Sequence, residues 1–117
     1  MPNPLDSENA SIRERLFGGN GAVHIWNCLG NQAAEPFKAV LWCALEPGGF
    51  VGRHRQEVFP EIVICVGGQG RAIVGETIHP LTEGALVFLP LGASLSLHND
   101  SKTEALNYII IKAKSGE

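Results

Sequence analysis

Short apolar runs separated by turn residues recur along most of the chain. The runs comprise residues 22–29, 37–45, 61–66, 71–74, 77–81, 86–89, 95–98 and 106–112. Stretches rich in glycine, such as Gly67 to Gly70, lie between them and favour tight hairpins. No long segment has the period of an amphipathic helix, and only residues 11–16 suggest a short turn. The pattern therefore predicts an all-β fold.

Residues 37–45 are apolar at odd and even positions alike, and residues 109–111 repeat this feature. A strand with one solvated face alternates instead, so both faces of these strands require burial. A barrel has only one interior, and we therefore predict a homodimer in which the outer face meets a second subunit. The alternative is that the N-terminal region covers this face with Ile12, Leu16 and Phe17.

Length and charge limit the kinds of partner. The chain has 117 residues and a formal net charge of -3, which indicates a single domain at 21–117 behind a flexible N-terminal arm at 1–20. It has no cluster of Lys or Arg and no apolar stretch long enough to span a membrane. We therefore expect no nucleic acid or membrane partner and a cytoplasmic location. The cysteines lie singly in apolar runs, which predicts buried, unpaired thiols.

Two spaced sets of residues carry a resemblance to a known family. The first set is Gly48, His54, Glu61 and Gly68, and the second is Gly84, Pro90, Gly92 and Asn99. Five residues separate Gly48 from His54, and six separate Glu61 from Gly68. This spacing resembles the two signatures of the cupin family over roughly residues 37–111. The resemblance implies a cupin-type double-stranded β-helix, which is a jelly-roll barrel.

Members of this family hold one divalent metal, commonly iron, manganese, nickel or zinc, with three histidines and the glutamate. In this sequence Gln56 replaces the second histidine and Leu95 replaces the last one. The resemblance thus implies a reduced metal set of His54, Gln56 and Glu61. An amide is a weak ligand for metals that prefer imidazole. Two interpretations of His54 stay open, namely a metal ligand and a pocket-wall histidine that pairs with Glu61.

Strand alternation indicates how the pocket is lined. His54 and Gln56 share one face of a strand, which we expect to point inward beside Glu61. The same alternation places Arg53, Arg55 and Glu57 on the opposite face. Leu95 and Leu97 are expected to form a facing apolar wall.

Two other histidines are considered as pocket residues. His98 lies an odd number of positions after Leu95, so alternation places it outside the pocket. His79 fits no pattern and is treated as structural. Whether either histidine reaches the pocket stays open.

Three functions are compatible with these residues, and whether the protein is an enzyme stays open. The favoured function is a binding module that holds a small organic molecule with one polar or acidic group at His54, Gln56 and Glu61. The alternative is a metal-dependent dioxygenase, isomerase or decarboxylase that uses His54 and Glu61. A metal-free enzyme with His54 as general base is a third option.

Overall fold

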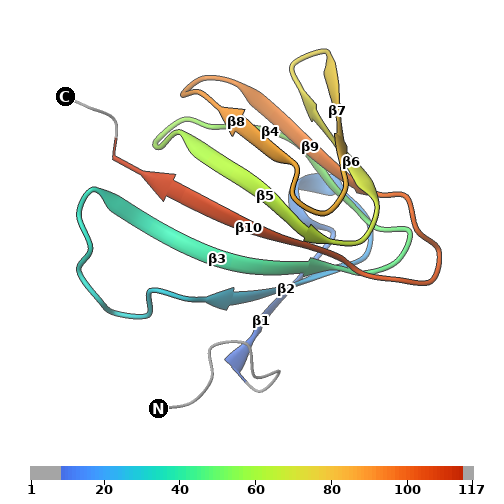
Figure 1. Ribbon diagram of the computed structural model, residues 1–117, viewed down its shortest axis with the longest axis horizontal. Helices are drawn as coiled ribbons and strands as arrows, with labels where there is room; N and C mark the ends of the chain where they lie inside the picture. The colour runs from blue at the N-terminus through green and yellow to red at the C-terminus, as the bar shows by residue number, and fades with distance from the viewer. Residues whose placement is uncertain (1–8, 115–117) are drawn as a thin grey trace.

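The computed structural model describes residues 9–114, which form two antiparallel sheets (Figure 1). The strands are β1 (Ser11–Glu14), β2 (Ala22–Asn27), β3 (Phe37–Leu45), β4 (Phe50–Arg55), β5 (Glu61–Gly67), β6 (Gly70–Val74), β7 (Thr77–Leu81), β8 (Leu86–Leu89), β9 (Ser94–Asn99) and β10 (Leu106–Ala113). A single turn of 3-10 helix, η2 (Leu16–Gly18), follows β1. The all-β prediction is confirmed. In this part of the chain no helix is long and apolar enough to cross a membrane.

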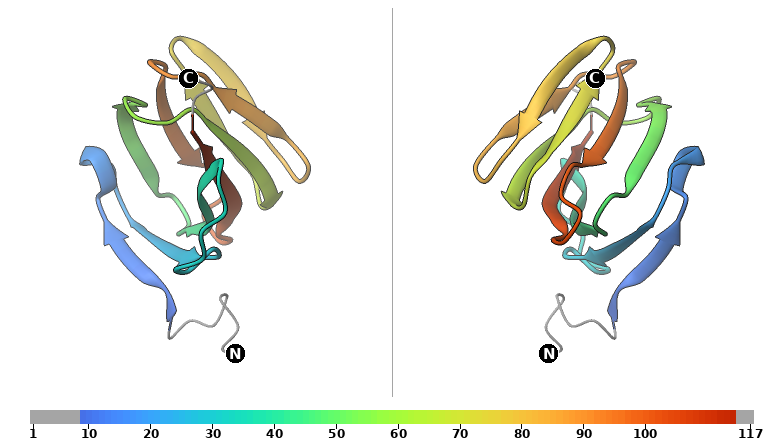
Figure 2. Two further views of the ribbon diagram at one scale, coloured as in Figure 1. Left: turned by 90° about the vertical axis from the view of Figure 1, so that its left-hand side faces the viewer. Right: turned by 90° about the vertical axis from the view of Figure 1, so that its right-hand side faces the viewer.

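The two sheets differ in size. The larger has the order β1-β2-β3-β10-β5-β8, and the smaller has the order β4-β9-β6-β7. Figure 1 shows the larger sheet as a continuous series of ribbons from β8 at the top to β1 at the bottom. Figure 2 shows that the blue β1–β2 hairpin and the yellow β6–β7 hairpin lie at opposite ends of the molecule. The crossovers between sheets are those of a jelly roll.

All eight apolar runs form strands, but two further strands, β1 and β4, do not coincide with any of these runs. β1 occupies the stretch where the sequence suggested only a turn, and β4 is polar at its C-terminal half. The N-terminal region also differs from the flexible arm expected at 1–20. Residues 11–14 pair with β2 as an edge strand, so this part of the arm belongs to the larger sheet. Residues 1–8 lie outside the described residues.

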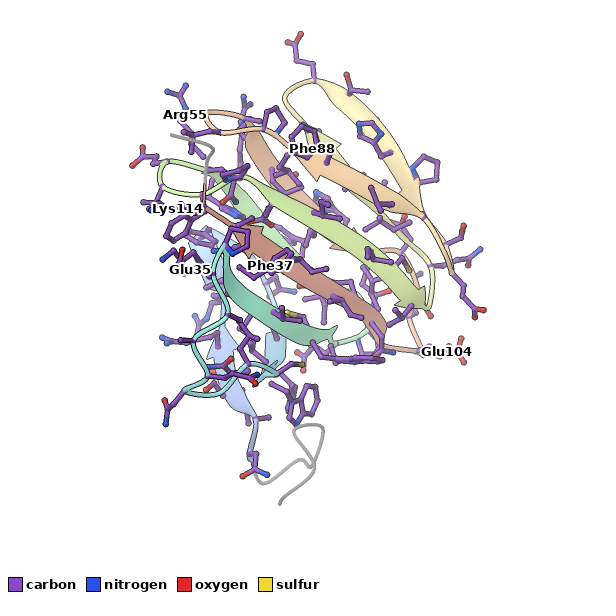
Figure 3. All side chains as sticks on the ribbon, turned by 60° about the vertical axis from the view of Figure 1, so that its left-hand side comes forward. Glu35, Phe37, Arg55, Phe88, Glu104 and Lys114 are labelled. Atoms are coloured by element: carbon purple, nitrogen blue, oxygen red, sulfur yellow. The ribbon has the colours of Figure 1, made fainter. Side chains whose placement is uncertain are left out.

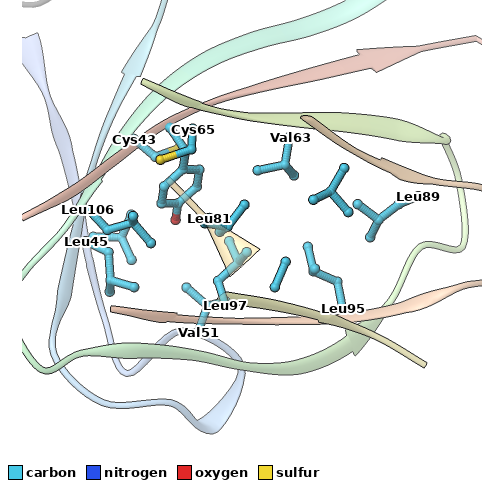
Figure 4. Close-up of a cluster of buried hydrophobic side chains, with 14 residues drawn as sticks. Cys43, Leu45, Val51, Val63, Cys65, Leu81, Leu89, Leu95, Leu97 and Leu106 are labelled. Carbon is cyan, nitrogen blue, oxygen red and sulfur yellow. The ribbon is translucent and has the colours of Figure 1, made fainter. Parts of the chain in front are cut away.

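The core lies between the two sheets. Figure 4 shows Val51, Leu95 and Leu97 of the smaller sheet facing Val63 and Leu89 of the larger one. All five are at most 3% exposed. Such burial contributes roughly 25 cal/mol per Å² of apolar surface and holds the sheets face to face. The inward positions of both sheets are thereby fixed, and with them the residues that can line a cavity.

Two residues of the sequence signatures have a structural role. Gly68 has a φ of 96°, and a Cβ there would lie 2.6 Å from the Ala105 carbonyl oxygen, so only glycine fits. Asn99 is buried, and its Nδ2 donates to carbonyl oxygens of Leu45 and Glu104 at 3.0 and 2.9 Å. Its Oδ1 accepts the backbone N–H of Ser101 at 2.9 Å. Asn99 thus ties β9 to the loops at the closed end of the barrel.

The outward side of the larger sheet is apolar. Its large side chains, here called the outer apolar face, are Trp26, Val40, Trp42, Ile62, Ile64, Leu86, Phe88, Ile109 and Ile111. Leu86 and Phe88 are each 58% exposed, and Phe88 is labelled in Figure 3. A face of this kind is typical of an interaction surface.

Candidate functional site

A cavity of about 500 Å³ opens between the sheets near β1, η2 and the end of β4. Its lining includes all five pocket residues expected from the sequence, which are His54, Gln56, Glu61, Leu95 and Leu97. The size falls in the range of sites that take small organic molecules. The structure therefore brings these five side chains together around one space.

A β-bulge in β4 sets the direction of His54. Val51 pairs with Leu97 and His54 with Leu95, so two residues of β4 lie opposite the single residue Ser96. The extra residue reverses the alternation and lets Val51 and His54, three positions apart, both face the cavity. Gln56 follows two positions later and is only 6% exposed. Its backbone N–H donates to the Ala93 carbonyl at 2.9 Å, which fixes its place.

His54 is held in one tautomer and covered by an aromatic ring. Its Nδ1 lies 3.0 Å from the Gly52 carbonyl oxygen, which can only accept, so Nδ1 carries the proton. Nε2 is then a free acceptor for a cavity ligand. The Phe17 ring stacks on the imidazole with centroids 3.9 Å apart. Burial lowers the pKa of His54 below its ordinary value, which keeps the ring neutral at pH 7.

An unusual backbone conformation at Phe17 brings its ring to His54. The φ of Phe17 is 53°, a left-handed conformation rare for a bulky residue. A Cβ at Gly52 would lie 1.9 Å from the Phe17 carbonyl oxygen, so glycine there lets η2 approach β4. No periodicity in the sequence indicated this contact. Only the tertiary approach of η2 to the β4 bulge creates it.

Glu61 is the most deeply buried carboxyl group of the site, at 3% exposed. Its Oε1 lies 4.0 Å from Nζ of Lys112, which stands directly opposite it on β10. Burial raises the pKa of Glu61, and the ammonium of Lys112 opposes that rise. Lys112 was not among the residues expected at the site from the sequence. The signal was present, because alternation from buried Tyr108 through Ile110 turns Lys112 inward.

The donor set does not fit a divalent transition metal. His54 offers one imidazole nitrogen, Gln56 offers an amide oxygen, and Glu61 already faces a lysine ammonium. Among residues 9–114 no group of three or more His, Cys, Asp or Glu side chains is placed to hold a metal. Leu95 lies opposite His54, where a ligand would complete the set, and has no donor atom. Sites for divalent transition metals usually need three strong protein ligands.

Other titratable residues take different positions. His98 lies on the opposite side of β9, as its odd offset from Leu95 indicated, and stacks on Phe50 with centroids 5.4 Å apart. His79 on β7 does not line the cavity either. Arg55 and Glu57, by contrast, line the cavity mouth although alternation placed them outward. β4 ends at Arg55, so the alternation that placed them outward ends there as well. Arg55 is labelled in Figure 3.

The cysteines are unpaired, as their spacing predicted, but Cys28 is only partly buried where a buried thiol was expected. Cys43 and Cys65 are buried, and burial raises the pKa of the Cys43 thiol to about 12. Both thiols behave as small apolar groups in the core.

No protein-family model and no curated protein matches this sequence. Solved structures do match. A predicted oxalate decarboxylase from Thermotoga maritima has a TM-score of 0.86 at 22% identity, covering 97% of this chain and 98% of that one. A cupin 2 conserved barrel domain protein from Salinispora arenicola has a TM-score of 0.77 at 21% identity, covering 98% and 89%.

A third structure widens the range of chemistry found on this architecture. The polyketide cyclase RemF from Streptomyces resistomycificus has a TM-score of 0.73 at 10% identity, covering 97% of this chain and 80% of that one. Similarities at these identities define the architecture and leave the chemistry to the residues of the site. Together with the two signatures, they confirm that this chain has the cupin fold.

Proposed function

We propose that the protein binds a small organic molecule in the cavity without the help of a metal ion. The observation that carries this proposal is the combination of a cavity of about 500 Å³ with a donor set too weak for a metal. His54, Gln56 and Glu61 line one side, and Leu95 and Leu97 line the facing side. A few polar groups opposite an apolar wall are typical of a site for a small organic ligand.

Each polar group has a definite capacity. Nε2 of His54 accepts a hydrogen bond, because Nδ1 already donates to the Gly52 carbonyl. The Gln56 amide both donates and accepts, and its side chain has no hydrogen-bond partner among residues 9–114. Because no fully buried side-chain nitrogen or oxygen in the described residues lacks a partner, the amide atoms of Gln56 are accessible from the cavity, where a ligand can hydrogen-bond to them.

The metal-dependent dioxygenase, isomerase or decarboxylase considered from the sequence is less well supported, because the third and fourth strong ligands are missing. A metal-free enzyme is the second candidate. The neutral imidazole of His54, with a free Nε2 facing the cavity, has the form of a general base. Only turnover of a bound ligand would distinguish this enzyme from a binding module.

A fragment screen by ligand-observed NMR tests the proposal. Fragments that bind the wild type are expected to lose binding to His54→Ala while the variant keeps its β-sheet circular dichroism. His98→Ala removes a histidine from the other side of the same sheet and is the matched control. A screen without cavity binders, or equal binding to His54→Ala, would contradict the proposal.

We also propose that a second copy of the chain covers the outer apolar face. The central positions of this face on β3, β10 and β5 are Val40, Trp42, Ile62, Ile109 and Ile111, none of which is charged. An isologous dimer brings a face against itself, so a face without charge avoids like-charge contacts.

The positions of Ile12, Leu16 and Phe17 favour a second copy over the N-terminal region as the cover. Leu16 and Phe17 line the cavity, and Ile12 lies on the edge strand at 57% exposure. None of the three lies over the central strands of the outer apolar face.

The unpaired cysteines are compatible with the reducing cytoplasm, which we retain as the proposed location.

A further inference from the structure

Lys112 and Glu61 form an incomplete polar pair inside the cavity. Their Nζ and Oε1 atoms are 4.0 Å apart, which is beyond the range of a hydrogen bond. Neither side chain has a hydrogen-bond partner among residues 9–114. Glu61 is nevertheless 97% removed from solvent, since only 3% of its surface is exposed, and both groups line the cavity. The pair therefore presents unused hydrogen-bonding capacity to whatever occupies this space.

The chemistry of the unused capacity is specific. Lys112 can only donate, whereas an ionised Glu61 and Nε2 of His54 can only accept. A complementary ligand thus needs an acceptor oxygen for the ammonium and a hydroxyl that donates to the carboxylate or the imidazole. A 2-hydroxy acid carries these two groups on neighbouring carbons. Its carbon skeleton would lie against Leu95 and Leu97.

The mouth of the cavity favours an anionic ligand. Arg13 and Arg55 both line the cavity, and neither guanidinium has an ion-pair partner within residues 9–114. Glu57 also lines the cavity, so two guanidinium groups and one carboxylate lie at its mouth. Unpaired cations at an opening raise the local concentration of anions and speed their entry.

We propose that the ligand is a small hydroxy acid whose carboxylate contacts Lys112 and whose hydroxyl group donates to Glu61 or His54. This inference rests on the proposed function and names its ligand class. In this arrangement Lys112 supplies inside the cavity the positive charge that a metal ion would supply in a site with a full ligand set.

Calorimetric titration with a matched set of three probes tests this assignment. Mandelate carries both groups, phenylacetate lacks the hydroxyl, and 1-phenylethanol lacks the carboxylate. We expect mandelate to bind at least about tenfold more tightly than phenylacetate or 1-phenylethanol. Each of these two probes lacks one of the charge-assisted hydrogen bonds that mandelate can make. Equal affinities of mandelate and phenylacetate, or of mandelate and 1-phenylethanol, would overturn the inference.

Variants assign the effect to the pair. Lys112→Met is expected to weaken mandelate about tenfold or more and to leave 1-phenylethanol unchanged, whereas Lys112→Arg keeps most of the mandelate affinity. Lys102→Met makes the same chemical change on an exposed loop outside the cavity and should have no effect. An equal response of Lys112→Met and Lys102→Met would contradict the role of Lys112.

The two proposals fail in different ways. If fragments of other classes bind at His54 and mandelate shows no advantage, the hydroxy acid is wrong and the binding function stands. If no probe and no fragment binds, both proposals are wrong.

Discussion

The two faces of the larger sheet differ in the polarity of their side chains, although the same strands contribute to both. On β10 the inward positions are Tyr108, Ile110 and Lys112, and they pass from a buried ring to an ammonium that lines the cavity. The outward positions between them are Ile109 and Ile111, which are both apolar. From Tyr108 to Lys112 the inner face of β10 thus changes from apolar core to polar cavity lining, while its outer face stays apolar.

This difference shows what each face contacts. Polar groups are tolerated on the inner face only where the cavity gives a partner access to them, because polar groups buried without partners cost free energy. The outer face has no comparable polar group at its centre, and partly exposed isoleucine and tryptophan side chains there favour an apolar partner. We interpret the inner face as a ligand site and the outer face as a subunit interface.

The largest expected effect comes from placing a charge on the outer apolar face. Ile109→Glu would put two buried carboxylates into a symmetric dimer, and we expect self-association to weaken by at least about 100-fold. Sedimentation velocity would show a shift from the dimer to the monomer mass. Ile78→Glu, which is 60% exposed on β7 of the other sheet, is the matched control. A monomeric wild type at micromolar concentration would contradict the interface.

An intermediate effect is expected from restoring the family ligands on the inner side. Leu95 pairs with His54, so Gln56→His with Leu95→His would gather three imidazoles and Glu61 around one point. We expect zinc or nickel affinity to rise at least about tenfold, at a cost of roughly 1 to 3 kcal/mol in the free energy of unfolding.

Calorimetric metal titration measures this gain. Combining Gln56→His with Ser96→His moves the second imidazole to the other side of β9 and should give no comparable gain. If the two double variants bind zinc equally, the assigned geometry of β4 and β9 is wrong.

The smallest effect is expected from uncovering His54. Phe17→Ala removes the stacked ring, so the pKa of His54 should rise toward its ordinary value of 6.5. Loss of the stack should lower the free energy of unfolding by about 1 kcal/mol. Because the folded pKa is lowered, the contribution of His54 to wild-type stability falls as the pH drops below 6.5, and this contribution should fall less in the variant.

NMR titration of the imidazole measures the change in pKa. Phe50→Ala removes the ring that stacks on His98 and should leave the His54 titration as in the wild type. A His54 pKa that does not respond to Phe17→Ala would mean that Phe17 does not exclude water from the imidazole.

The sequence was most informative where the period of two was unbroken. The runs that became β5, β8 and β9 were predicted close to their observed bounds, and the pairing of Leu95 and Leu97 on one face followed from alternation. His54 and Gln56, which were expected on a common face, both line the cavity, although the bulge before His54 was not foreseen. Local periodicity determines the side of a strand when nothing interrupts it.

The residues that were missed depend on contacts between distant segments. Phe17 reaches His54 through a left-handed backbone conformation after an edge strand, which no local pattern indicated. Lys112 was readable in principle, because it lies an even number of positions after Tyr108. That Lys112 lies opposite Glu61, however, follows only from the register of β10 against β5. Such registers are fixed by tertiary pairing and not by the sequence of one strand.

The most direct test of a metal-independent site is the affinity of one cavity ligand before and after removal of metals. The strongest fragment that requires His54 would be titrated into untagged protein, with the metal content measured before and after dialysis against chelator. We predict the same dissociation constant in both states, because the donors of the site do not fit a metal. Loss of binding on chelation, restored by one equivalent of iron, manganese, nickel or zinc, would contradict this account.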